Sequence, residues 1–313
     1  MTNNPENGLG RAIDSIIRRA LEEDVGSGDV TSIATVDASV SATARFLAKE
    51  AGVLSGTNPA ARVFEFVNED LQVDWLRRDG EELLKGEIIG RVSGSARAIL
   101  TGERTALNIL QRMSGIATLT ARMAAEARPF GASVLDTRKT APGIRVLDRM
   151  AVLHGGGQNH RFGLYDMMLI KDNHIAAAGS IDRALEDART YRAKSRLTDM
   201  KIEIEARTLH EVGEVIAFWE THAVPDRILL DNMARKEPGG ALDTTTLSTA
   251  VKLVANRIET EASGNVDLTT VAAIAATGVD YISSGALTHS VRALDISLEF
   301  SPTRRWRTDV RND

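Results

Sequence analysis

The chain has 313 residues, of which 43% are hydrophobic and 26% are charged, and its formal net charge is -5. This composition is typical of a globular protein and, without a basic surplus, it argues against a nucleic-acid binder. The absence of cysteine excludes disulfides, thiolate nucleophiles and cysteine-ligated zinc, and it is consistent with a reducing cytoplasm.

The first part of the chain mixes helical and extended patterns. The first ten residues lack the charged and apolar regions of a signal peptide, and we expect a short disordered lead-in there. Apolar residues recur at helical spacing in three stretches: 11–23, 59–67 and 99–128, the last interrupted near Gly115. Three other stretches are typical of strands: 42–56, 71–77 and 86–94. No apolar run approaches the length that spans a membrane.

After residue 128 the pattern becomes a regular alternation. Short apolar runs are separated by segments whose apolar residues recur at helical spacing, such as 181–193 and 209–219. This alternation predicts parallel strands with covering helices. The runs are 133–135, 167–170, 202–204, 228–230, 257–261 and 281–282. At about 150 residues the region is shorter than the roughly 250 of a complete eight-unit barrel, so we expect an incomplete or irregular one. A last strand at 293–300 is expected to return to the first domain, and 301–313 to be a solvated tail.

Each of these runs ends in polar or small residues. Parallel strands place their C-terminal ends on one face, where barrel enzymes carry their active sites. The strand ends are 136–139, 171–173, 205–207, 231–232, 263–265 and 283–285. The sequence therefore predicts one polar site assembled from several strand ends.

Positive charge is concentrated in part of this region. Between Thr137 and His174 there are six Lys and Arg residues against three Asp and Glu. Arg138 and Lys139 directly follow a strand, and a guanidinium can bind a carboxylate or phosphate with two hydrogen bonds. We expect a small, highly anionic ligand, although a surface loop of solvated cations is the simpler interpretation of any single pair.

Glycine and histidine are weaker signals in the same stretch. The run 155–157 permits a sharp turn or a close approach to a ligand, but it matches neither the Walker loop nor the dinucleotide fingerprint. His160 is a candidate hydrogen-bond donor or general acid, whereas His154 and His174 are expected to be structural. We do not expect these histidines to form a metal site, since no His-x-x-x-His pair occurs.

Acidic residues end two neighbouring strands. Glu205 and Asp231 are candidates for indirect metal binding or for stabilising a developing positive charge. They could equally be salt-bridge partners that hold the basic side chains in place. Glu203 has the same strand-face orientation as Glu205 but is expected one layer deeper.

Small polar residues end the last two expected barrel strands. Late barrel strands often hold phosphate through backbone N–H groups, although the same residues also favour ordinary turns. The candidates are Ser263, Gly264, Asn265, Ser283, Ser284 and Gly285.

With these motifs in place, the sequence resembles the quinolinate phosphoribosyltransferase family. The resemblance covers most of the chain and is most specific in the central part. The matching segments are 23–25, 28–31, 102–108, 136–143, 155–161, 169–174, the strand with Glu203 and Glu205, 229–232, 261–264 and 284–290. The chain departs from many relatives near 218–227, where a helix-to-strand connection looks longer.

The resemblance implies an N-terminal α/β sandwich domain, 1–128 with 290–313 returning to it, and an open, incomplete (β/α) barrel at 129–289. It also implies an enzyme that works as a homodimer or a higher assembly of dimers, and the lack of cysteine leads us to expect a cytoplasmic location. Arg104 would cross the interface into the neighbour's site.

The implied reaction transfers phosphoribosyl from 5-phosphoribosyl 1-pyrophosphate to quinolinate with decarboxylation, giving nicotinate mononucleotide, pyrophosphate and CO2 in NAD biosynthesis. The pyrophosphate substrate would carry Mg²⁺. The quinolinate carboxylates would be bound by Arg104, Arg138, His160 and Arg161, with Thr137 beside them. Lys139 and Lys171 would lie between carboxylate and phosphoryl groups, and Glu205 and Asp231 would stabilise the ribose cation or hold Mg²⁺. The Ser, Gly and Asn residues of the two late loops would hold the 5′-phosphate.

Two other functions compete with this one. Lys171 at a strand end also suits a Schiff-base aldolase on a barrel. A nucleotide- or phosphate-sensing module without activity is the non-enzymatic alternative.

Overall fold

The computed structural model describes residues 5–237 and 239–302. Contacts divide this part of the chain into two units, which are described separately below. The first unit contains the residues up to Thr118, Ala141–Gly155 and those from Val291, and the second contains Leu119–Thr140 and Gly156–Ser290. The domain boundaries expected at residues 128 and 289 stay a prediction.

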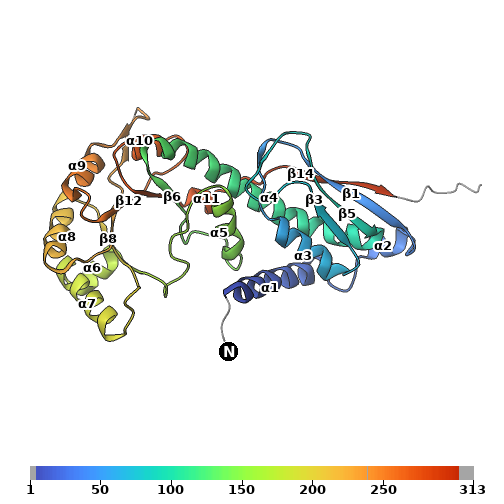
Figure 1. The fold of residues 1–313 in the computed structure, drawn as a ribbon, viewed down its shortest axis with the longest axis horizontal. Helices are drawn as coiled ribbons and strands as arrows, with labels where there is room; N and C mark the ends of the chain where they lie inside the picture. The colour runs from blue at the N-terminus through green and yellow to red at the C-terminus, as the bar shows by residue number, and fades with distance from the viewer. Residues whose placement is uncertain (1–4, 238, 303–313) are drawn as a thin grey trace, which may run out of the picture. The chain divides into compact units, whose positions relative to one another are not determined.

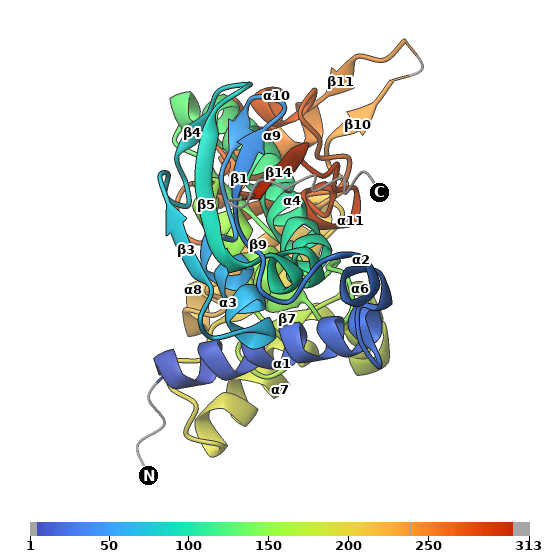
Figure 2. The same cartoon turned by 90° about the vertical axis from the view of Figure 1, so that its right-hand side faces the viewer.

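The first unit combines a four-stranded sheet with several helices (Figure 2). Helix α1 (Pro5–Val25) packs against α3 (Thr57–Val67), and α2 (Val30–Thr35) lies between them in sequence. The sheet order is β14-β1-β5-β3, and all its pairings are antiparallel. Its strands are β1 (Ser41–Ala48), β3 (Gln72–Trp75), β5 (Ile88–Ser95) and β14 (Ile296–Pro302), and a second ladder joins β2 (Gly52–Val53) to β4 (Glu82–Leu83).

The last strand returns to the first unit, as the family resemblance implied. β14 pairs with β1 along its length, from Ala42 opposite Pro302 to Ala48 opposite Ile296. Buried alternate residues of β1, among them Ala44 and Phe46, fill the core side of this sheet. The strand begins three residues later than expected, and residues 303–313 of the expected tail lie outside the described residues.

The long helix α4 (Ala96–Ala127) is continuous, so the interruption expected near Gly115 is wrong. Gly115 is needed for packing instead. A Cβ atom at this position would lie 2.2 Å from the carbonyl oxygen of Arg292 and 3.1 Å from Cα of Ala293. Glycine thus allows the segment before β14 to pass directly over the helix.

Helix α5 (Arg145–His154) also belongs to the first unit, although the sequence suggested no helix there. Its Asp148 is fully buried and forms a two-pronged ion pair with Arg112 of α4, with both N···O distances at 2.8 Å. The backbone N–H of Ala141 donates to the same carboxylate at 3.3 Å. This polar anchor is a tertiary contact, which apolar periodicity cannot reveal.

The second unit is built on six parallel strands in the order β6-β13-β12-β9-β8-β7. Their bounds are β6 (Ser133–Leu135), β7 (Met168–Ile170), β8 (Ile202–Ala206), β9 (Arg227–Asp231), β12 (Glu259–Ser263) and β13 (Tyr281–Ser283). In the described residues the edge strands β6 and β7 form no ladder with each other. The mixed α/β class and the open barrel are therefore confirmed.

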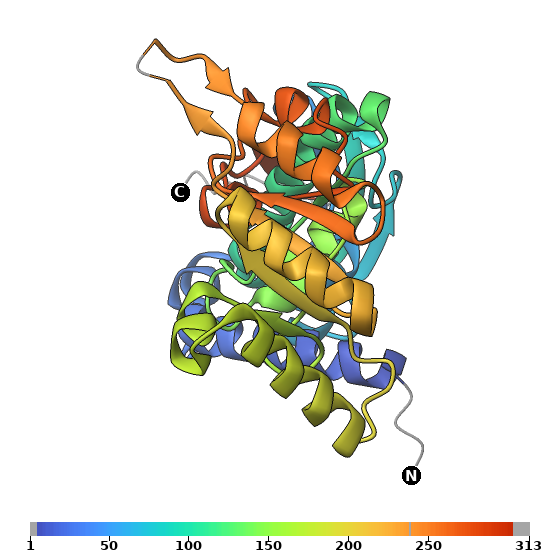
Figure 3. The same cartoon turned by 90° about the vertical axis from the view of Figure 1, so that its left-hand side faces the viewer.

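Helices cover the outside of this curved sheet (Figures 1 and 3). α7, α8 and α9 lie side by side, and each joins two strands of the sheet. The helices of this unit are α6 (Asp172–Ala178), α7 (Ile181–Lys194), α8 (Leu209–His222), α9 (Thr245–Val254), α10 (Val271–Ala275) and α11 (Ala286–His289). The expected helices at 181–193 and 209–219 are thus confirmed, with ends one to three residues further on.

Two local features differ from the sequence prediction. Helix α1 starts at Pro5, so the expected lead-in is wrong for residues 5–10, whereas residues 1–4 lie outside the described part. A small hairpin, β10 (Arg235–Lys236) with β11 (Leu242–Asp243), projects from the second unit after β9. Among the helices of the described residues, none is both long and apolar enough to cross a bilayer.

Candidate active site

A cavity of about 830 Å³ lies within the second unit at the C-terminal ends of its strands. Five of the six polar strand ends contribute side chains, as parallel strands place these ends on one face. The lining residues are Thr137, Arg138, Lys139, His160, Arg161, Leu169, Lys171, Leu229, Asp231, Asn232, Lys236, Glu261, Ser263, Gly264, Asn265, Val266, Asp267, Ser283, Ser284, Gly285, Ala286 and His289.

Nearly all of the site residues expected from the sequence line this cavity. Arg104 does not, because it lies on α4 in the first unit. Glu205 is not among the lining residues either, although its carboxylate contacts Lys171, which is. Of the six basic residues between Thr137 and His174, two do not line the cavity. These are Arg145 and Arg149, which lie on α5 in the first unit.

Arg138 and Arg161 both line the cavity, and their positive charges repel each other. Burial lowers the pKa of Arg161, and the positive charge of Arg138 lowers it further. Arg161 is only 9% exposed, and its Nη1 donates to the backbone carbonyl of Met167 at 3.2 Å. A bound anion would relieve the repulsion between the two cations, which makes this wall suited to a carboxylate.

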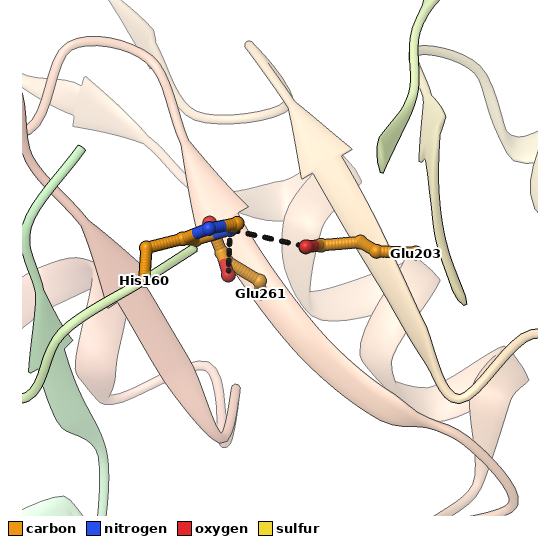
Figure 4. Close-up of side chains that lie close together, drawn as sticks. All are labelled: His160, Glu203 and Glu261. Atoms are coloured by element: carbon orange, nitrogen blue, oxygen red, sulfur yellow. Dashed lines mark ion pairs between the residues drawn. The ribbon is translucent and has the colours of Figure 1, made fainter. Parts of the chain in front are cut away.

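His160 lies in a buried polar cluster with Glu203 of β8 and Glu261 of β12 (Figure 4). Its Nε2 is 3.0 Å from Oε2 of Glu203 and 3.4 Å from Oε2 of Glu261. Burial disfavours the imidazolium, but the contacts with the two carboxylates outweigh it and raise the pKa of His160 to about 9. The three side chains could also hold a metal ion by donor type and spacing.

The second ring nitrogen of His160 is engaged as well. The backbone N–H of Arg161 donates to Nδ1 at 2.7 Å, and the backbone N–H of His160 donates to Asp136 at 2.7 Å. A proton on Nδ1 would face the N–H of Arg161, so this hydrogen bond favours the neutral ring that is protonated on Nε2 alone. The two carboxylates act in the opposite direction, because they favour the doubly protonated imidazolium. The hydrogen bond is the more specific constraint, and we assign the Nε2–H form.

Arg227 completes the charge balance of the cluster. Its Nη1 lies 2.9 Å from Glu261, and its guanidinium stacks 3.8 Å from the ring centre of Tyr281. Arg227 is also opposite Glu203 in the ladder between β9 and β8. Burial raises the pKa of Glu203 to about 7, and the negative charge of Glu261 adds to the effect. Glu203 is fully buried, and neither of its carboxylate oxygens has a well-aligned hydrogen bond among the described residues.

A second acidic pair lies beside Lys171. Its ammonium group is 3.6 Å from Glu205, which is 6% exposed. Burial raises the pKa of Glu205, and the negative charge of Asp231 raises it further. Asp231 accepts a hydrogen bond from the hydroxyl of Ser263 and faces the cavity. Two carboxylates that repel each other beside an open cavity suit a cationic group.

The late loops form a tight backbone wall on the same cavity. Gly264 has a φ of +88°, and a Cβ atom there would lie 2.2 Å from the side-chain oxygen of Asn232. The hydroxyl of Ser284 donates to the carbonyl of Val266 at 2.8 Å, which ties the two loops together. This close packing requires the small residues that the sequence places there.

Two other histidines have structural contacts, as expected. His154 lies in the first unit, where its Nδ1 is 2.8 Å from the hydroxyl of Ser55. His174 accepts the backbone N–H of Lys171 at 2.9 Å and thereby caps α6.

Several lining residues were missed by sequence reasoning. Asn232 was expected only as part of a strand end, and Lys236 and Asp267 were not expected at all. Arg227 and Glu261 were assigned no role, although Glu261 ends an expected strand. A charged residue directly before an apolar run, as Arg227 is before Ile228, was the available signal for a buried ion pair.

Two family models match the chain: "Quinolinate phosphoribosyl transferase, N-terminal domain" over residues 29–114 and the corresponding "C-terminal domain" over residues 116–299. The chain is 51% identical over 291 residues to "Nicotinate-nucleotide pyrophosphorylase [carboxylating], chloroplastic" of Arabidopsis thaliana, covering 92% of this chain and 82% of that protein. It is 42% identical over 277 residues to the "Probable nicotinate-nucleotide pyrophosphorylase [carboxylating]" of Bacillus subtilis (strain 168), covering 88% and 89%.

Solved structures have the same fold over nearly the whole chain. The structure of NadC from Streptococcus pyogenes has a TM-score of 0.84 at 36% identity and covers 97% of this chain and 100% of that one. The nicotinate-nucleotide pyrophosphorylase from Francisella tularensis has a TM-score of 0.84 at 34% identity and covers 93% and 96%.

Proposed function

The chain belongs to the quinolinate phosphoribosyltransferase family, and we propose that its cavity transfers the phosphoribosyl group of 5-phosphoribosyl 1-pyrophosphate to quinolinate. The products are nicotinate mononucleotide, pyrophosphate and CO2, a step of NAD biosynthesis. The observation that carries the proposal is the convergence of Arg138, Lys139, Arg161 and Lys171 on one cavity. Both substrates are polyanions, and such a cluster of cations attracts and orients them.

Arg138 and Arg161 form the quinolinate side of the cavity. Their guanidinium groups can each grip a carboxylate with two hydrogen bonds, and the bound anion removes the repulsion between them. His160 was expected to donate to the same carboxylates, and this role stays a prediction. The contacts of both ring nitrogens favour a different task, in which His160 fixes the backbone of Arg161.

The reaction needs electrostatic stabilisation more than acid–base catalysis. The pyridine nitrogen attacks C1 of the ribose, the bond from C1 to pyrophosphate breaks, and pyrophosphate leaves with the electron pair. The C1 centre is transiently cationic, and the carboxylates of Asp231 and Glu205 stabilise that charge. Lys139 and Lys171 neutralise the departing phosphoryl oxygens. The C2 carboxylate then leaves as CO2, and its electron pair on the ring takes a proton.

We propose that Asp231 and Glu205 would hold Mg²⁺ bound together with the pyrophosphate substrate. The residues fit this ion by donor type, since the carboxylate of Asp231 faces the cavity and that of Glu205 lies beside Lys171. The mutual repulsion of the two carboxylates supports the binding of a cation beside them. When bound, Mg²⁺ would neutralise charge on the pyrophosphate oxygens.

The proposed working form is a homodimer, or an assembly of dimers, in the cytoplasm. Arg104 does not line the cavity of its own second unit, which supports its expected task in the site of a neighbouring subunit. The lack of cysteine supports a reducing compartment.

A steady-state assay of the purified protein tests the function directly. With phosphoribosyl pyrophosphate and Mg²⁺, we expect CO2 release and nicotinate mononucleotide from quinolinate, and much slower turnover of nicotinate. Borohydride added with a carbonyl substrate should leave Lys171 unmodified, since a covalent adduct would favour an aldolase. Absence of CO2 release with quinolinate would overturn the proposal and favour a sensing module.

A further inference from the structure

The hairpin of β10 and β11 brings a fifth cation to the cavity. Lys236 ends β10 and lines the cavity, whereas its neighbour Arg235 does not. The ammonium group of Lys236 lies 2.8 Å from Oδ2 of Asp267, another lining residue. Neither residue lies in the segments that carried the resemblance to the family, of which 229–232 and 261–264 are the nearest.

The base of the hairpin is fixed against the loop that follows β12. The backbone N–H of Asn232 donates to the carbonyl of Ser263 at 2.9 Å, and the side-chain amide of Asn265 donates to the carbonyl of Ala234 at 3.3 Å. Met233 and Ala234 are buried. Lys236 is therefore carried to the same wall as Ser263, Gly264 and Asn265.

The ion pair is poorly suited to be a structural anchor. The side chains of Lys236 and Asp267 are 46% and 41% exposed, and ion pairs with such exposure contribute little to stability. The hairpin base already has its own hydrogen bonds and buried side chains. Oδ1 of Asp267 accepts the backbone N–H of Thr269 at 2.8 Å, which leaves Oδ2 to hold the ammonium group at the cavity wall.

The wall beside Lys236 otherwise offers neutral donors. Ser263, Gly264 and Asn265 supply hydroxyl, amide and backbone N–H groups, whereas the substrate phosphate expected there is a dianion. Lys139 lies against the other late loop, since its Cδ would be 2.7 Å from a Cβ on Gly285. Lys236 supplies the positive charge that the Ser263–Asn265 side lacks.

We propose that Lys236 is a ligand of the 5′-phosphate of the phosphoribosyl substrate, and that Asp267 holds its ammonium group at the wall until the phosphate arrives. The inference rests on the proposed function of the cavity and adds a binding residue to it. A phosphate dianion outcompetes a single exposed carboxylate for the ammonium group, so Lys236 exchanges partners by a rotation of its flexible side chain. The carboxylate left behind repels the phosphate, which weakens binding.

Steady-state kinetics on Lys236→Gln, Asp267→Asn and the matched control Arg235→Gln test the inference. For Lys236→Gln we expect the KM for phosphoribosyl pyrophosphate to rise about tenfold, with the KM for quinolinate unchanged. Product inhibition by nicotinate mononucleotide, which carries the 5′-phosphate alone, should weaken equally, and inhibition by inorganic pyrophosphate should not change. Asp267→Asn keeps the lysine and should lower the KM for phosphoribosyl pyrophosphate, and Arg235→Gln should match the wild type.

Three results would overturn the inference. Equal kinetic constants for the Lys236 and Arg235 variants would show that Lys236 does not bind the substrate. A similar rise of KM in the Lys236 and Asp267 variants would show that the ion pair only anchors the hairpin. Weaker inhibition by pyrophosphate, but not by the mononucleotide, would show that Lys236 binds the pyrophosphate group and not the 5′-phosphate. If the wild type itself releases no CO2 from quinolinate, the proposed function fails; a normal Lys236→Gln enzyme refutes this inference alone.

Discussion

Nε2 of His160 lies 3.0 Å from the carboxylate of Glu203, and the fully buried Glu203 has no well-aligned hydrogen bond among the described residues. Glu261 and Arg227 surround the pair, so four ionisable groups share one buried space. His160 in turn accepts the backbone N–H of Arg161. The cluster therefore connects buried charge to Arg161, which lines the cavity and which we propose binds a quinolinate carboxylate.

The cluster makes stability depend on pH. Burial raises the pKa of Glu203 to about 7, so this carboxyl group holds its proton more tightly in the folded state than in the unfolded chain. It therefore contributes stability that is fully present below its unfolded pKa and is lost as the pH rises through about 7. Glu203→Gln removes this titration and keeps the shape.

We expect the unfolding free energy of the wild type, relative to Glu203→Gln, to fall by on the order of 2 kcal/mol between pH 5 and pH 9. Chemical denaturation of both proteins at pH 5, 7 and 9 measures it. Parallel pH profiles would show that Glu203 does not titrate in this range.

Arg161 and Arg145 lie in the same basic stretch of sequence but in different units. Arg161→Ala removes the guanidinium that faces the cavity, and we expect kcat/KM for quinolinate to fall by about 100-fold or more, since a buried charge partner is lost. Arg145→Ala, on α5, should remain near the wild type. Equal loss in both variants would indicate a general effect on folding, and near-normal Arg161→Ala activity would remove its role.

The proposed crossing of Arg104 predicts complementation between inactive subunits. Arg104→Ala and Lys139→Ala homodimers should each have little activity. In a random mixture, half of the dimers are mixed, and each has one site with both residues intact, so about a quarter of the wild-type activity should return after subunit exchange. If Arg104 acts within its own chain, no mixture will exceed the activity of its components.

Gly115 and Gly213 provide a matched pair of stability tests. A Cβ at Gly115 would meet the Arg292 carbonyl at 2.2 Å, so Gly115→Ala should destabilise the first unit by about 1–3 kcal/mol. Gly213 is an exposed residue within α8 that has open space around it, and Gly213→Ala should stabilise by about 0.5–1 kcal/mol. Thermal denaturation compares the two, and opposite shifts of the midpoint are expected.

Much of the second unit could be predicted from periodicity and strand ends. The predicted apolar runs correspond to β6, β7, β8, β9, β12 and β13, because parallel strands that are buried on both faces consist of continuous apolar residues. The C-terminal ends of parallel strands lie on one face, so the polar residues there lie together. The motif around Arg138, Lys139, Arg161 and Lys171 marked the cavity for the same reason.

The missed features depend on contacts between distant segments. Helix α5 is held by the ion pair of the buried Asp148 with Arg112. Arg145 and Arg149 lie on this helix and therefore do not line the cavity. The break expected at Gly115 followed from glycine's low helix propensity, whereas the residue is there to let another segment pass closely. Lys236 escaped notice because its hairpin has only two paired residues in each strand.

The central claim is that Arg138, Lys139, Arg161 and Lys171 form one cradle for two polyanionic substrates. A difference map from crystals grown with quinolinate tests it most directly. The account predicts density for a dicarboxylate ring between the two guanidinium groups, with the ring nitrogen facing the side of Asp231. Quinolinate bound away from these four side chains, or no density at saturating quinolinate, would contradict it.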